Sequence, residues 1–137
     1  MGAVNWLAVV LGALAFLAVG ALWYGPLFGK AWRREVRMSA SVVRQQRGNS
    51  PRLIRLLAAS FVLELVIAWM LGHLIARTSP APHVIMMFAL GFGAFLMSPA
   101  LGINYLYQSR SLKLWLIDSG HFIVGMAAMG GVFVALT

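Results

Sequence analysis

Asp118 and His121 interrupt an apolar stretch of the chain, LWLIDSGHFIVGM, which covers residues 114–126. At a spacing of three residues, the two side chains lie on the same face of a helix. A carboxylate beside an imidazole can relay protons, bind a cation or supply two metal ligands. The structural alternative is a polar lock, in which Asp118 bonds to Asn104 or receives the side chain of Arg55 and so holds helices in register. Both roles stay open at this point.

Glu64 and Asn104 are two further polar residues within apolar stretches. Ionisable side chains at membrane depth are costly and are functional candidates by default. Glu64 shares its helix face with small residues that let another helix approach closely, namely Ser60, Ala68 and Gly72. Asn104 shares a face with Gly93, Met97 and Ala100. We predict that four side chains converge inside the bundle as an intramembrane polar site: Glu64, Asn104, Asp118 and His121.

The depth of these four residues agrees with that prediction. Counted from the nearest basic residue at about 1.5 Å of rise per residue, they lie roughly 8 to 13 Å inside the apolar layer. The basic residues used for this count are Arg55, Arg110 and Lys113. All four polar residues therefore belong to the same half of the membrane.

Four apolar stretches must position these side chains, over residues 4–24, 53–76, 84–107 and 112–136. The chain has 137 residues, of which 61% are hydrophobic and only 10% charged, too few charges for the surface of a soluble domain. Each stretch reaches the roughly 20 residues that cross a hydrocarbon core, where the backbone must be helical. The prediction is a single all-α, polytopic transmembrane domain with four membrane-spanning helices, over residues 1–137. Pro99 predicts a kink in the third span.

The basic residues predict the orientation of the spans. Of the eleven lysines and arginines, only Arg77 follows the second span, and the others lie at the opposite ends of the spans. The positive-inside rule therefore places the connection 25–52 in the cytoplasm and both termini outside, in a multi-pass protein of the inner (plasma) membrane. Aromatic residues near the inner span ends fit an interfacial belt: Trp23, Tyr24, Tyr105, Tyr107 and Trp115.

The basic connection has a helical pattern over residues 29–47, with apolar residues at Trp32, Val36, Ala40 and Val43. This pattern predicts a short amphipathic helix on the cytoplasmic membrane surface. Its basic side chains would face anionic lipid headgroups: Lys30, Arg33, Arg34, Arg37, Arg44 and Arg47. A topology signal without specific lipid recognition explains the same cluster and is the simpler interpretation.

The composition also limits the partners and cofactors. The net charge is +8, but its concentration between apolar spans points to the lipid bilayer and argues against nucleic acid. There is no cysteine, which excludes disulfides and thiolate ligands. We expect no cofactor and no metal site. Because four helices enclose little space, we expect a homo-oligomer.

Two long stretches resemble one known family. Residues 5–32, NWLAVVLGALAFLAVGALWYGPLFGKAW, resemble its opening helix, and residues 103–130, INYLYQSRSLKLWLIDSGHFIVGMAAMG, resemble its closing one. The chain is thus similar to the bacterial membrane family called domain of unknown function 1761. The resemblance implies a four-helix inner-membrane protein without an assigned activity. It also favours Asn5, Asn104 and Asp118 over Glu64 as family-wide positions, whereas Gln108 stands where an acidic residue is expected.

Three classes of function follow from these observations. The first is a non-enzymatic, oligomeric transporter or channel linked to protons, for a small solute. The second is a structural or regulatory membrane module that binds anionic lipid or a partner protein through the basic connection. The third is an intramembrane enzyme, which we do not expect, because Asp118 and His121 alone form no nucleophile–base pair or zinc signature.

Overall fold

The computed structural model of the chain describes residues 2–37 and 50–137, and the regular structure in these residues is helical. The elements are α1 (Trp6–Leu22), η1 (Trp23–Leu27), α2 (Gly29–Glu35), α4 (Ser50–Thr78), α5 (Pro82–Gly91), η2 (Phe92–Met97), α6 (Ser98–Tyr107) and α7 (Leu112–Ala135). The labels η1 and η2 denote π-helical segments. Four helical stretches are long and apolar enough to cross a membrane: Trp6–Leu27, Pro51–Thr78, Pro82–Tyr107 and Leu112–Ala135. The predicted all-α fold with four such helices is confirmed.

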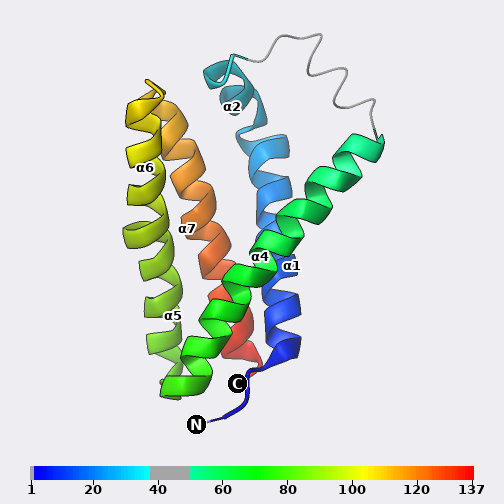
Figure 1. Ribbon diagram of the computed structural model, residues 1–137, viewed down its shortest axis with the longest axis vertical. Coiled ribbons are helices and arrows are strands. Elements are labelled where there is room, and N and C mark those ends of the chain that lie inside the picture. The colour runs from blue at the N-terminus through cyan, green and yellow to red at the C-terminus, as the bar shows by residue number, and fades with distance from the viewer. Residues whose placement is uncertain (1, 38–49) are drawn as a thin grey trace.

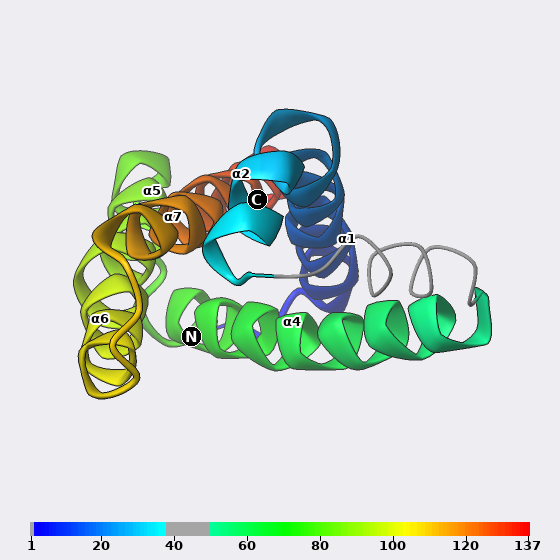
Figure 2. The same ribbon diagram turned by 90° about the horizontal axis from the view of Figure 1, so that it is seen from above.

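The helices form an up-and-down bundle with both chain ends at one end (Figure 1). The helix α2 and the turn between α6 and α7 lie at the other end. Seen along the bundle, α7 lies between α1 and the continuous rod of α5, η2 and α6, while α4 lies along one side (Figure 2). Asn5 joins the two chain ends, because its side chain caps α1 at the amide of Ala8 and donates to the carbonyl of Leu136.

The core is centred on α7, which packs on α1, α5, η2 and α6. Its buried apolar residues include Met126, Met129 and Phe133. Glycines let the neighbouring helices approach closely: a Cβ on Gly125 would lie 2.8 Å from the Phe16 ring, and one on Gly130 would lie 2.7 Å from the Cβ of Ala89. Small residues at such contacts are how helices pack in lipid, where burial of apolar surface gives little driving force.

The helix α4 packs differently at its two ends. Its C-terminal half lies on α1 and buries Glu64, Ala68, Leu71 and Gly72. Residues 51–60 are all exposed, and in Figure 1 this N-terminal half diverges from α1. The divergence leaves space between α4 and the rest of the bundle at the end that carries α2.

The structure changes the limits predicted for the first span and for the connection that follows it. The first span, predicted over residues 4–24, extends further, because η1 continues the helix through Gly25 and Pro26 to Leu27. The short helix predicted in the connection is present as α2, which ends at Glu35 and so covers, within the described residues, only the first part of the predicted range 29–47. Arg37, with φ of 60°, has a left-handed conformation that does not continue a right-handed helix. Residues 38–49, with Arg44 and Arg47, lie outside the described residues.

The third span contains its irregularity just before Pro99. Proline has no amide hydrogen for the carbonyl four residues earlier, that of Phe95. The segment η2 precedes Pro99 with π-helical turns, in which each amide bonds to the carbonyl five residues before it. The Ser98 hydroxyl also donates to the Gly93 carbonyl at 2.6 Å, across the same five residues.

Candidate functional site

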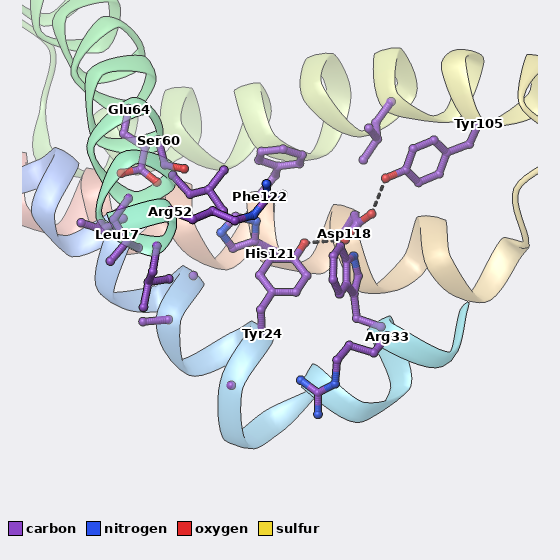
Figure 3. A pocket seen from close by; sticks show the side chains of 18 residues that line it. Leu17, Tyr24, Arg33, Arg52, Ser60, Glu64, Tyr105, Asp118, His121 and Phe122 are labelled. Carbon is purple, nitrogen blue, oxygen red and sulfur yellow. Dashed lines mark hydrogen bonds between the residues drawn. The ribbon is translucent and has the colours of Figure 1, made fainter. Parts of the chain in front are cut away.

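A cavity of about 840 Å³ lies between the N-terminal half of α4 and the rest of the bundle. Figure 3 shows side chains from several elements meeting around it. The ionisable and tyrosyl residues of its wall are Tyr24, Arg33, Arg52, Glu64, Tyr105, Asp118 and His121. Most of the remaining wall is aliphatic or aromatic, as in small-molecule sites, where a few polar groups orient the ligand.

Asp118 is the centre of a hydrogen-bonded network at one side of the cavity. The Tyr24 hydroxyl donates to Oδ1 of Asp118 at 2.5 Å, and the Tyr105 hydroxyl donates to Oδ2. The carboxyl side chain is only 6% exposed. The two hydroxyl groups replace the hydrogen bonds to water that a carboxylate loses when it is buried. Asp118 of α7 therefore ties η1 and α6 together, which is the polar lock with tyrosines as its partners.

Tyr24 reaches Asp118 because η1 is held directly against α7. The indole of Trp23 donates to the carbonyl of Ile117 at 2.8 Å. Gly120 makes room for that indole, since a Cβ at Gly120 would lie 2.7 Å from Cζ2 of Trp23. The η1 segment thus brings two consecutive aromatic side chains to α7, one bonded to the backbone and one to Asp118.

Tyr105 occupies the place predicted for Asn104. The buried positions along the third span are Ile85, Ala89 and Gly93 at intervals of four, and then Ser98 at an interval of five. The extra residue in η2 rotates the rest of the span by roughly 100° relative to a regular α-helix. Asn104 is exposed and does not line the cavity, so the predicted convergence of all four polar residues is not observed.

His121 lies one helical turn from Asp118, with its ring between aromatic neighbours. Its ring centroid is 4.9 Å from that of Tyr24 and 5.2 Å from that of Phe16, both in edge-to-face geometry. Nε2 is buried without a hydrogen-bond partner in the described residues. It faces Gly20, where a Cβ would lie 3.0 Å from this nitrogen. The imidazole therefore keeps one unused polar atom at the cavity wall.

Glu64 belongs to the same cavity but not to the Asp118 network. Its side chain is 7% exposed, and Oε2 has no hydrogen-bond partner among the described residues. A buried carboxyl oxygen without a donor is unfavourable unless a proton, a cation or a bound molecule satisfies it. Glu64 is the polar group of the cavity that most needs a ligand.

The basic residues divide between the cavity and the surface. Arg33 and Arg52 line the cavity, and in Figure 3 Arg33 lies at the side opposite Glu64. The side chains of Lys30, Arg34 and Arg37 are exposed. At its far end, α2 is attached to α7, because the Ser111 hydroxyl, which also caps α7, donates to Glu35 at 2.6 Å.

The sequence pattern indicated Glu64, Asp118 and His121 as residues of one site, but it did not indicate the two tyrosines. Tyr24 and Tyr105 were assigned to the interfacial belt, because tyrosines near span ends usually lie there. A signal was present: Tyr24 and Tyr105 fall near the level of Asp118 when the spans are aligned at their inner ends. No group of three or more histidine, aspartate or glutamate side chains that could hold a metal occurs among residues 2–37 and 50–137.

The sequence profile of one family, described as "Protein of unknown function (DUF1761)", matches residues 7–134. The chain belongs to this family. The matched range includes every cavity-lining residue, so the cavity is built entirely from the segment that defines the DUF1761 family. No curated protein and no solved structure matches the chain.

Proposed function

We propose that this DUF1761 protein is a non-enzymatic membrane carrier that binds a small amphipathic solute in the α4 cavity and exchanges it for a proton at Glu64. The observation that supports this is the combination of a large, mainly apolar cavity with a buried carboxyl oxygen that has no partner. An intramembrane ionisable group in a cavity is typical of solute and proton pathways. Apolar walls suit the body of the solute, and Glu64 suits its polar group.

Several ionisable groups share the cavity with Glu64. The ionisable groups that share the cavity are Arg52 on α4 itself, Tyr24 on η1, Arg33 on α2, Tyr105 on α6, and Asp118 and His121 on α7. Asp118 already has two hydroxyl donors, which leaves Glu64 as the carboxyl that a solute can compete for.

The test uses proteoliposomes that contain a trapped pH-sensitive dye. Three adamantane derivatives with one apolar body are added under an imposed pH gradient: the trimethylammonium, the sulfonate and the neutral alcohol. Proton movement that follows at least one of them, and that is lost in Glu64→Gln but kept in Glu35→Gln, supports the proposal. Glu35 lies outside the cavity lining, which makes it the matched control. No solute-dependent proton movement with any of the three would contradict it.

The proposal includes an orientation and an assembly. We place the protein in the inner membrane, with the 25–52 connection in the cytoplasm, both termini outside and a homo-oligomer as the working unit. The positive-inside rule supports the orientation. The small size of the bundle supports the assembly, because transporters of this length usually work in more than one copy.

A second candidate function is recognition of anionic lipid through α2. It is favoured by the exposed Lys30, Arg34 and Arg37, which adjoin the cavity residue Arg33. In that case Arg34→Gln with Arg37→Gln would lower the amount of phosphatidylglycerol, relative to phosphatidylcholine, that stays bound when the protein is purified in detergent from mixed vesicles, and Glu64→Gln would leave it unchanged. The carrier proposal predicts the reverse for proton movement, which Glu64→Gln should abolish and Arg34→Gln with Arg37→Gln should leave unchanged.

A further inference from the structure

We propose that the solute of the α4 cavity is an organic cation, a quaternary or protonated amine on a compact apolar body. This inference rests on the proposed function, since it names the chemical class of the solute that the carrier binds. It follows from the charged side chains, the aromatic rings and the arrangement of the cavity wall.

The charge requirement comes from Glu64. Its carboxyl group is more than nine-tenths buried, lines the cavity and has one oxygen without a partner in the described residues. A cationic group placed beside this carboxylate would supply a countercharge, whereas an anion placed there would meet a like charge in a poorly solvated site. His121 Nε2, a second buried atom of this wall without a hydrogen-bond partner in the described residues, is an acceptor when the imidazole is neutral and this nitrogen carries no proton.

The rings of the wall support the same class. Tyr24, Trp32 and Phe122 line the cavity, and the faces of such rings attract cations, quaternary ammonium groups included. Tyr24 and Trp32 also contact each other edge to face, with ring centroids 5.5 Å apart, so together they form one aromatic corner of the cavity, at the side of η1 and α2, whereas Phe122 belongs to α7. An alcohol or an anion would gain no comparable attraction from these rings.

The position of the arginines is consistent with a cation held deep in the cavity. Arg52 and Glu64 are twelve positions apart on one helix, which corresponds to roughly 18 Å along α4. Arg33 lies at the side opposite Glu64 in Figure 3. Because Coulomb energies fall with distance, a cation next to the Glu64 carboxylate is attracted more strongly than it is repelled by an arginine at the far side of the cavity, such as Arg33. The cavity wall also contains aliphatic residues that suit an apolar body: Leu17, Leu53, Leu56, Leu57 and Leu101.

Binding is measured by isothermal titration calorimetry on the full chain in lipid nanodiscs, with empty nanodiscs subtracted. The probes are the adamantane trimethylammonium, the sulfonate and the neutral alcohol, which share one body and differ in charge. We expect the cation to bind at least tenfold more tightly than the alcohol and the sulfonate. Glu64→Gln should abolish this preference and Glu64→Asp should keep part of it, whereas Glu35→Gln should leave it unchanged.

Three results would overturn the inference: equal binding of the three probes, tighter binding of the sulfonate, or a cation preference that survives Glu64→Gln. The carrier proposal fails separately. If the sulfonate or the alcohol drives Glu64-dependent proton movement in proteoliposomes and the cation does not, the carrier stands and the cation assignment falls. If no probe moves protons but the cation binds through Glu64, the assignment of the site stands and transport falls.

Discussion

The Tyr105 hydroxyl donates a hydrogen bond to Oδ2 of Asp118, thirteen residues along the chain and on the neighbouring helix. Tyr24 donates to the other oxygen from the first span. One carboxylate thus connects three of the four spans near the end of the bundle that carries α2. Because Asp118 is buried and both of its carboxyl oxygens accept a hydrogen bond, this network is expected to contribute measurably to stability.

Removal of either hydroxyl should destabilise the fold. We expect Tyr105→Phe and Tyr24→Phe each to lower the free energy of unfolding by about 1 to 3 kcal/mol, because a buried charged acceptor loses a donor. Unfolding in mixed micelles with increasing SDS measures this change. Asn104→Ala is the control, and it should stay within about 0.5 kcal/mol of the unchanged chain, because Asn104 is exposed. A larger cost at Asn104 than at Tyr105 would show that the span is rotated the other way.

Adjacent glycines in α7 should respond in opposite ways to alanine. A Cβ at Gly130 would lie 2.7 Å from the Cβ of Ala89, whereas Gly131 has nothing within 4 Å. Gly130→Ala should therefore destabilise the protein by about 1 to 3 kcal/mol, because two backbones must separate. Gly131→Ala should be neutral or stabilising by up to about 1 kcal/mol, because alanine favours the helix. Thermal unfolding of the two variants in one detergent compares them, and equal shifts would contradict the packing of α5 on α7.

Variants of Asn5 should separate its two roles, which are to cap α1 and to join the two chain ends. Asn5→Ala removes both the cap at Ala8 and the bond to Leu136 and should cost about 1 to 2 kcal/mol. Asn5→Ser keeps a capping oxygen but loses the amide donor, so it should recover only part of the loss. Full recovery with serine would mean that the bond to Leu136 contributes nothing.

The predicted orientation can be tested by labelling, because the chain contains no cysteine. We expect Gln108→Cys to react with a membrane-impermeant maleimide only after the inner face of the membrane is opened, and Ala81→Cys to react in intact spheroplasts. Both positions are exposed in turns at opposite ends of the bundle. The reverse pattern would invert the topology and place the basic connection outside.

The fold follows from local properties of the chain, and for that reason most of it could be predicted. Long apolar stretches in lipid have few alternatives to helix, so the number of spans and their approximate limits depend on residues close in sequence. The positions of Glu64, Asp118 and His121 along their helices follow from helical rise alone. These three residues do line one cavity, as the pattern indicated.

The partners of these residues depended on the tertiary structure. Regular helical geometry directs Asn104 toward Asp118, but the π-helical residues before Pro99 rotate the following turns and present Tyr105 instead. Tyr24 faces Asp118 because Trp23 and Gly120 hold η1 against α7. The cavity exists because the half of α4 that precedes Glu64 diverges from α1 (Figure 1). Hydropathy and charge along the sequence determine which segments are long and apolar enough to cross a membrane and where each residue lies along its helix. The rotation and tilt of each helix depend on contacts between distant segments, and these determined which side chains meet.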